Sequence, residues 1–157
     1  AQMLIDGFAR EVQQRYPSNI EAVVPLNEAL TIASLLEREA YDFTDMREIS
    51  GVIWNRLFLD MPLQLDATLQ YVRGSEPTGP WWPTPRSKDK WLDSPFNTYQ
   101  NEGLPPHPIA NPSVEAILAA LNPIETDCLF YIHAPGGAFY CAATYPEHQA
   151  NINRYLR

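Results

Sequence analysis

The sequence predicts a single α+β domain that is mostly helical, with a β-hairpin or small sheet and a long loop rich in proline and tryptophan. Three observations support this fold class. Apolar residues recur at helical spacing in several segments, two short β-rich runs flank a Gly-Gly pair, and the 157 residues are about the size of one domain. The composition, 45% hydrophobic and 19% charged, is ordinary for a globular protein.

Capping residues and apolar stripes place the helices. Asn27, Thr44 and Asp66 are predicted N-caps, Asn111 precedes a proline that can open a helix, and Gly74 is expected to end one in a left-handed conformation. The predicted helices cover residues 3–16, 27–41, 46–59, 67–73, 111–123 and 146–157. The residues expected to face the core are Leu4, Ile5, Phe8, Val12, Tyr16, Leu26, Leu30, Ala33, Leu36, Ile49, Val52, Ile53, Leu57, Ile152, Tyr155 and Leu156.

Two short strands are predicted on either side of Gly136 and Gly137, and each run carries a cysteine. Cys128 and Cys141 could face each other across this hairpin, but the sequence does not set the register. A disulfide would suit an extracytoplasmic domain, and two buried thiols are the alternative.

Residues 75–112 differ in composition from the predicted helices, since they hold most of the 15 prolines and three of the four tryptophans. A stretch of this length without clear periodicity is more often a functional loop than a linker. Trp81, Trp82 and Trp91 could stack on sugar rings, whereas the ordinary alternative is that they pack the loop against the body.

Charge and composition exclude several function classes. Eleven basic and nineteen acidic residues give a net charge of -8, which repels nucleic acid. We expect a soluble chain, because no apolar run approaches the length of a membrane span. No metal or other cofactor is expected: His107, His133 and His148 are scattered, and no phosphate-binding loop or serine nucleophile elbow is present.

Two glutamates stand out in the stretch ASLLEREAYDF. Residues two apart on a helix do not share a face, so Glu37 and Glu39 cannot form a carboxylate pair. Glu37 falls beside Leu26 and Leu30, while Glu39 lies at the far edge of the apolar arc. A carboxyl at such a margin loses hydration, which raises its pKa and suits a general acid in glycosidic cleavage. The alternative is a surface salt bridge to a nearby arginine, and periodicity does not choose between the two glutamates.

Four separated blocks occur in an order that resembles a known family. They are TIASLLEREA, ISGVIWNRLFLDMPLQLDATLQYV, FNTYQNEGLPPHPIANPSVEAILAALNP and LFYI…GGAFYCAATYPEHQANINRYL. Together they resemble the catalytic domain of the YceG-like, or MltG-type, endolytic murein transglycosylases. The resemblance implies an enzyme that cuts peptidoglycan strands between N-acetylmuramic acid and N-acetylglucosamine without water, leaving 1,6-anhydro-muramyl ends.

The resemblance also implies roles for particular residues. Glu39 is expected to be the catalytic residue, first as acid and then as base, with Glu37 as a supporting neighbour. His148 is expected to make a structural hydrogen bond. The residues expected to position substrate are Asn55, Arg56, Gln64, Asp66, Thr68, Tyr71, Asn97 and Tyr99. Each has a structural alternative: Asp66 could only cap its helix, Arg56 could only pair with Glu37 or Glu48, and Asn97 could only hold a turn.

The same resemblance predicts the organisation of the protein. Residues 26–157 are expected to form the catalytic domain, and residues 1–25 a helix that connects it to an absent upstream region with a membrane anchor. The expected location is extracytoplasmic, either periplasmic or on the outer face of the cytoplasmic membrane. The expected partners are peptidoglycan strands and glycan-polymerising synthases. The alternatives are a non-catalytic peptidoglycan-binding or scaffolding module, a lysozyme-like hydrolase, and a helical interaction domain that docks a protein through its tryptophan loop.

Overall fold

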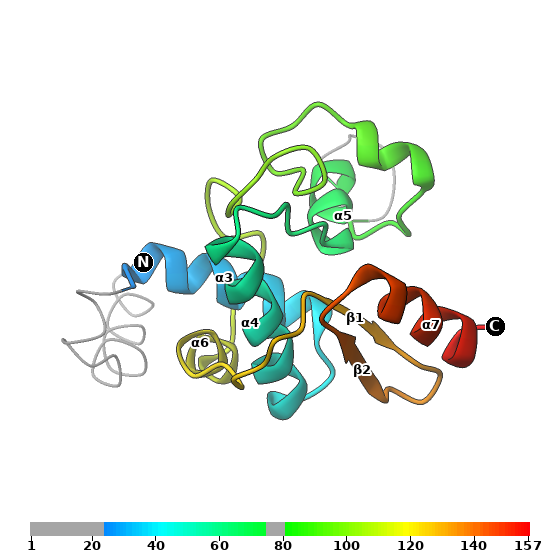
Figure 1. Cartoon of the computed structure of the whole chain (residues 1–157). Helices are drawn as coiled ribbons and strands as arrows, with labels where there is room; N and C mark the ends of the chain where they lie inside the picture. Colours follow the sequence, from blue (N-terminus) through cyan, green and yellow to red (C-terminus); the bar gives the residue numbers. More distant parts are fainter. Residues whose placement is uncertain (1–23, 75–80) are drawn as a thin grey trace, which may run out of the picture.

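The computed structural model describes residues 24–74 and 81–157. These residues form a mostly helical domain with a small antiparallel sheet, which confirms the predicted α+β class (Figure 1). The predicted helix over residues 3–16 lies outside the described residues, as does part of the proline-rich loop. The elements are α3 (Leu26–Glu39), α4 (Phe43–Phe58), α5 (Asp66–Gly74), the 3-10 helix η2 (Ser87–Trp91), α6 (Val114–Leu121), β1 (Phe130–His133), β2 (Phe139–Ala142) and α7 (Tyr145–Tyr155).

The core lies where α3, α4 and α6 pack together. Ile32, Leu36 and Ile49 are fully inaccessible to solvent. Leu26, Leu30 and Leu57, which were also predicted to face the core, are partly buried against it. Gly51 allows the chain after α6 to approach α4 closely, because a Cβ at this position would clash with the carbonyl oxygen of Ile124. This helical centre gives the rest of the domain a fixed base.

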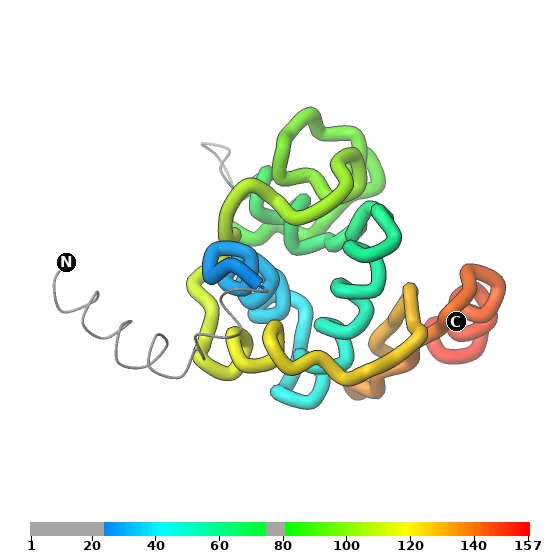
Figure 2. Tube along the Cα trace, turned by 60° about the vertical axis from the view of Figure 1, so that its left-hand side comes forward, coloured from blue at the N-terminus to red at the C-terminus, as the bar shows by residue number. Residues whose placement is uncertain are grey.

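Two further parts flank the helical centre. The segment containing α5 and η2 lies on one side, and the hairpin with α7 lies on another, in both views of the chain (Figure 1, Figure 2). The hairpin turns at Gly136 and Gly137, which both adopt the positive φ that favours glycine. In its register Tyr131 pairs with Cys141. Helix α7 packs on both strands.

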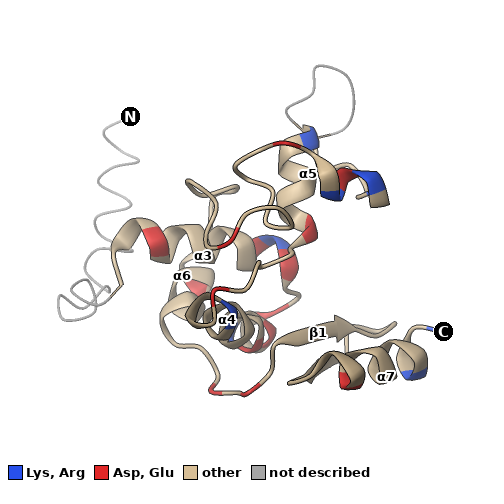
Figure 3. Ribbon diagram, turned by 45° about the horizontal axis from the view of Figure 1, so that its top comes forward, with Lys and Arg blue, Asp and Glu red and all other residues tan. Residues whose placement is uncertain are grey.

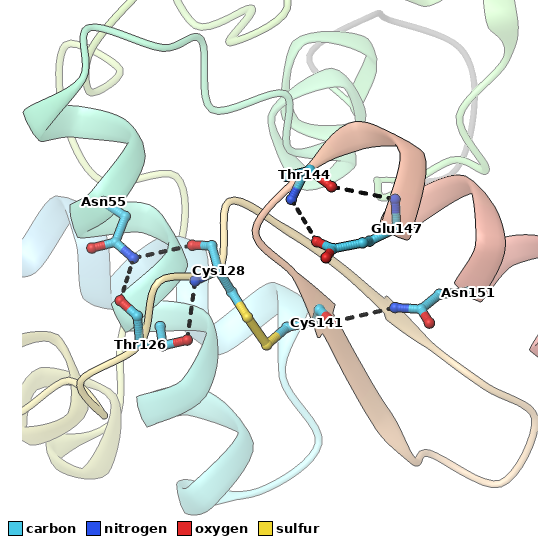
Figure 4. The surroundings of a disulfide bond; sticks show 7 residues. All are labelled: Asn55, Thr126, Cys128, Cys141, Thr144, Glu147 and Asn151. Atoms are coloured by element: carbon cyan, nitrogen blue, oxygen red, sulfur yellow. Dashed lines mark hydrogen bonds between the residues drawn. A yellow bond between two sulfur atoms is a disulfide. The ribbon is translucent and has the colours of Figure 1, made fainter.

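Cys128 and Cys141 form a disulfide with a Cα–Cα distance of 5.7 Å (Figure 4). Cys128 precedes β1 and Cys141 belongs to β2, so the bond ties the entry of the hairpin to its returning strand. Asn55 of α4 donates hydrogen bonds to the carbonyls of Thr126 and Cys128 at 2.8 and 3.1 Å. The hairpin is thereby attached to the helical centre.

Several helix boundaries differ from the predictions. Asp42, and not Thr44, caps α4 by accepting from the Asp45 amide, and Ser113, and not Asn111, caps α6. Helix α3 begins at Leu26 without a side-chain cap from Asn27. The prediction of a left-handed Gly74 was also wrong.

Two predictions at helix ends also differ from the structure: the conformation of Gly74 and the burial of Leu156 at the end of α7. Gly74 is the last residue of α5 and lies against Trp81, where an added Cβ would be at a van der Waals distance of 3.4 Å. Leu156 lies just beyond α7 and is 46% exposed, because the chain leaves the helix there.

The long loop is an ordered layer over its described part, residues 81–112. Buried Asn97 holds it together: its side-chain amide donates to the carbonyls of Lys90 and Leu92, and its oxygen accepts from the Tyr99 amide. Trp82 packs beneath Arg38, with the guanidinium 4.1 Å from the ring centroid. Trp81 and Trp91 are largely exposed.

Candidate active site

A cleft of about 370 Å³ opens between the two flanking parts of the domain. Glu39, the last residue of α3, lies in it and is partly buried. Residues of the segment leading into α5 and of η2 line one side of the cleft, and residues of β1 and α7 line the other. Its lining residues are Glu39, Val52, Ile53, Arg56, Leu63, Gln64, Leu65, Asp66, Lys90, Tyr99, Phe130, Tyr131, Ile132, Tyr145 and His148.

Both oxygens of the Glu39 carboxyl are held by donors from different elements. Oε1 accepts from the backbone N–H of Ala67 at 3.2 Å, and Oε2 accepts from the hydroxyl of Tyr131 at 3.0 Å. Ala67 is in the first turn of α5, where backbone N–H groups have no partner within the helix and the helix dipole favours negative charge. The carboxyl is therefore oriented from both sides of the cleft.

Burial raises the pKa of Glu39 above its ordinary value of 4.5, because desolvation disfavours the carboxylate. The negative charge of Asp66 acts in the same direction, whereas the hydrogen bonds from Ala67 and Tyr131 act against it. The outcome is a carboxyl that holds a proton at higher pH than an exposed glutamate, with donors in place for its charged form. Such a group can both give and take a proton.

Tyr131 was missed by sequence reasoning, although it contacts the candidate catalytic group. It lies on β1, and its ring stacks on Phe139 of β2 at a centroid distance of 5.6 Å. Burial and the charge of Glu39 raise its pKa well above 10, so the phenol stays a neutral donor. Only the strand register brings this tyrosine to the end of α3, and no local pattern in the sequence signals it.

Glu37, the other glutamate that periodicity left as a candidate, has different contacts. Its Oε2 accepts from the amide and the hydroxyl of Ser113 at 2.9 and 2.8 Å. Ser113 caps α6, so Glu37 fixes the start of that helix. Glu37 is therefore a structural neighbour of the site, and it forms no ion pair with Arg56 among the described residues.

Three of the predicted substrate-positioning residues meet at one wall of the cleft. Tyr99 donates from its hydroxyl to Oδ1 of Asp66 at 2.7 Å. Burial and the adjacent Asp66 raise the pKa of Tyr99, so this phenol also remains neutral. Gln64 is exposed in the cleft and has a φ of 54°, a left-handed backbone that is unusual for a residue with a side chain. The amide of Gln64 donates to the carbonyl of Thr98.

Arg56 reaches the cleft, and its Nε and Nη1 donate to backbone carbonyls of neighbouring segments. Its guanidinium donates to the carbonyls of Leu129, Pro62 and Leu63 at 2.6 to 3.0 Å. It does not pair with Glu37 or Glu48 among the described residues. Arg56 therefore joins α4 to the approach of β1 and to the segment before α5.

Four predicted site residues are not among those that line the cleft. Asn55 faces the far side of α4, Thr68 is fully buried against Thr98, Tyr71 packs with Trp82 and Phe96, and Asn97 holds the loop. None of the three loop tryptophans is a cleft-lining residue either.

The opposite wall carries aromatic residues that sequence reasoning did not assign to the site. Phe130, Tyr145 and His148 line it, and the imidazole of His148 stacks on Phe130 with ring centroids 5.2 Å apart. The predicted structural hydrogen bond of His148 is not seen at Nδ1, which is buried without a partner in the described part of the chain. Desolvation, with a contribution from Arg56, lowers the pKa of His148. Flat apolar faces here suit the C–H faces of sugar rings.

Comparisons with known proteins agree with the resemblance. The model of the YceG-like family matches residues 1–154. An endolytic murein transglycosylase of Bacillus subtilis is 38% identical over 133 residues, covering 85% of this chain and 36% of the relative. One of Streptococcus pneumoniae is 36% identical over 132 residues, covering 83% and 24% respectively. The chain thus spans roughly a quarter to a third of the length of these relatives.

A solved structure with the same fold extends this comparison. The crystal structure of a YceG-like protein from Listeria monocytogenes superposes with a TM-score of 0.72 at 34% identity. The match covers 94% of this chain and 45% of that one.

Proposed function

Given that this chain belongs to the YceG-like family, we propose that it is a lytic transglycosylase that cuts peptidoglycan glycan strands internally. The cleavage proposed is that of the bond from N-acetylmuramic acid to N-acetylglucosamine. The proposal rests on the position of the Glu39 carboxyl. It is partly buried in an open cleft and accepts hydrogen bonds from donors on α5 and β1. The names of the curated relatives support the substrate class.

In the mechanism that we propose, the Glu39 carboxyl acts first as a general acid and then as a general base. Protonated Glu39 gives its proton to the glycosidic oxygen as the bond from that oxygen to C1 breaks. The resulting carboxylate then accepts the proton of the C6 hydroxyl while O6 bonds to C1, which closes the 1,6-anhydro ring. No water is consumed. Ala67 and Tyr131 are placed to stabilise the carboxylate between these steps.

Digestion of purified sacculi followed by mass spectrometry of the muropeptides tests this proposal. We expect 1,6-anhydro-muramyl ends from the wild-type chain and a loss of about 100-fold or more in rate for Glu39→Gln, because general acid–base action contributes about 10²–10⁴-fold. Glu37→Gln is the matched control, since Glu37 contacts Ser113 and not the cleft. A Glu39→Gln variant that cuts at the wild-type rate would remove Glu39 from the mechanism.

A lysozyme-like hydrolase is a second candidate, favoured by one observation. Asp66 supplies a second carboxylate to the same cleft, and a hydrolase of glycosides uses two. Asp66 is already bonded to the hydroxyl of Tyr99, which supports a positioning role instead. Ordinary reducing ends in the digest, lost in both Glu39→Gln and Asp66→Asn, would favour hydrolysis.

A non-catalytic binding or scaffolding module would behave differently. It would be retained by insoluble peptidoglycan in a pull-down while yielding no cleavage products.

We propose that residues 26–157 are the catalytic domain and residues 1–25 its connection to upstream sequence. We also propose that the protein works outside the cytoplasm beside glycan-polymerising synthases. No helix in the ranges 24–74 and 81–157 is long and apolar enough to cross a membrane.

A further inference from the structure

Two cationic side chains line the cleft, and they are used differently. Arg56 is buried and donates from Nε and Nη1 to three backbone carbonyls. Lys90 forms no ion pair within the described residues, and its ammonium lies 4.7 Å from the ring centroid of Tyr99. Lys90 is therefore the exposed cation of the cleft, whereas Arg56 is buried, and it lies at the wall that holds Tyr99 and Asp66.

The backbone at Lys90 is fixed in a way that a solvated surface lysine does not need. Its carbonyl oxygen accepts from Asn97 at 3.2 Å and from Gln100 at 2.8 Å. The preceding residue, Asp89, is 1% exposed and forms salt bridges with Arg73 and Arg86. The long loop thus holds η2 firmly and sets the position from which the Lys90 side chain reaches the cleft.

Lys90 brings a positive charge to a cleft that also holds acidic groups. The whole chain carries a net charge of -8, and the cleft contains the carboxyls of Glu39 and Asp66. On the ribbon, Asp and Glu gather around the end of α3 and the start of α4, while Lys and Arg positions lie in the segment beside α5 (Figure 3). An anionic strand entering this cleft would be repelled unless one point offered it a cation.

Peptidoglycan strands carry such anions on one of their two sugars. Each muramyl unit has a lactyl group, which ends in a free carboxylate or is joined to a peptide stem that has carboxylates of its own. N-acetylglucosamine has neither. We propose that Lys90 binds a carboxylate of the muramyl unit and so determines which sugar lies on its side of Glu39. This inference rests on the proposed function, since it names the feature of the substrate that the same cleft would recognise.

Binding can be measured apart from turnover in a Glu39→Gln background, which leaves the strands uncut. The variants are Lys90→Gln and Lys90→Arg, with Lys88→Gln as the matched control, because Lys88 is an exposed lysine of the same 3-10 helix that does not line the cleft. The three ligands, of equal length, are strands with peptide stems, strands freed of stems by an amidase, and N-acetylglucosamine oligomers. Dissociation constants are compared at low and at high salt.

We expect Lys90→Gln to weaken binding of muramyl-containing strands about 2- to 5-fold at low salt, as befits one exposed charge pair. The loss should shrink at high salt, Lys90→Arg should restore most of the affinity, and N-acetylglucosamine oligomers should show no loss. A loss confined to stem-bearing strands identifies the stem carboxylates as the anion. A loss confined to stem-free strands identifies the lactyl carboxylate, which is free only there, and a loss on both kinds of strand shows that Lys90 accepts either anion.

The inference is overturned if Lys90→Gln and Lys88→Gln bind all three ligands alike, or if no glycan binds. It is also overturned if the loss is equal for N-acetylglucosamine oligomers. These outcomes are separable from failure of the proposed function. A chain that yields anhydro ends but is indifferent to Lys90 loses only this inference, whereas Lys90-dependent binding without cleavage sinks only the transglycosylase assignment.

Discussion

At the scale of single residues, the behaviour of the cleft depends on how Glu39 is held. Desolvation favours its protonated form, while the N–H of Ala67 and the hydroxyl of Tyr131 favour its charged form. A residue that first donates and then accepts a proton needs both forms within reach. The structure supplies this balance with one partly buried carboxyl and two neutral donors.

Tyr131→Phe tests how the phenol hydroxyl affects the pKa of Glu39 and the rate of cleavage. The hydrogen bond from Tyr131 lowers the pKa of Glu39, so its loss should raise that pKa further. Because the first step needs protonated Glu39, activity falls as the pH rises through this pKa, and the alkaline limb of kcat/KM should move to higher pH. We also expect about a tenfold lower kcat, by analogy with the loss of one hydrogen bond to a developing charge.

Tyr140→Phe is the control for this profile, because Tyr140 lies on β2 and stacks on Tyr155 of α7, away from Glu39. Its profile should match that of the wild type. An unchanged limb in Tyr131→Phe, or one displaced to lower pH, would contradict the role given to the phenol.

The raised pKa of Glu39 also predicts how stability depends on pH. A carboxyl whose pKa is higher in the folded state contributes stability that is fully present below its unfolded pKa and is lost as the pH rises through the folded value. Glu39→Gln should therefore unfold at a higher temperature than the wild type at pH 7. The difference should vanish as the pH falls below about 4.5, the ordinary value for glutamate. Thermal melts across this range, in which Glu39→Gln gained nothing at neutral pH, would count against a desolvated carboxyl.

The predicted site residues fall into two groups in the structure, those that line the cleft and those that are buried behind other residues. Glu39, Gln64, Asp66 and Tyr99 lie within motif blocks, and the structure brings them to one cleft. Thr68 and Asn97 lie in the same blocks but are fully buried supports. A motif marks residues that a site depends on, and it does not separate those that line the cleft from those that shape it.

At the scale of elements, the hairpin matters because it carries Tyr131 to Glu39. The disulfide ties the entry of the hairpin to its returning strand, and Asn55 bonds to the segment before β1 (Figure 4). Arg56 also bonds to that segment, and His133 of β1 bonds to Asp45 of α4. The two-stranded sheet has little stability of its own, since an isolated hairpin is marginal in water. Its position therefore depends on these cross-links.

Replacing both cysteines, Cys128→Ser with Cys141→Ser, should reduce the free energy of unfolding by about 3 kcal/mol, the chain-entropy value for a loop of this size. For a domain of this length that corresponds to a melting temperature lower by roughly 6–12 °C. Calorimetry of the oxidised wild type, the reduced wild type and the double variant measures it. Identical melts for all three would show that the bond contributes nothing to stability.

Helix existence could be predicted from periodicity, whereas the helix ends could not. Asp42 and Thr44 are both good caps in type, and the choice of Asp42 depends on the turn that leaves α3, which no local pattern specifies. The start of α6 was shifted for a similar reason, because Ser113 caps the helix while also donating to Glu37. Tertiary contacts decided between neighbouring candidates.

At the scale of the whole molecule, the cleft is a product of packing between segments far apart in sequence. Glu39, Ala67 and Tyr131 meet although 92 residues separate the first from the last. The α+β class and the hairpin follow from composition and periodicity, since these report on which faces are buried. The wall of Phe130, Tyr145 and His148 does not, because its members become neighbours only when α7 folds back onto the hairpin.

The most direct test of the central claim, that Glu39 closes a sugar ring without water, is digestion of peptidoglycan in water enriched in heavy oxygen. The account predicts muramyl ends that carry no label and have the mass of the anhydro form, with none formed by Glu39→Gln. Incorporation of heavy oxygen at the newly formed muramyl ends would contradict it, because that oxygen can only come from attack by water.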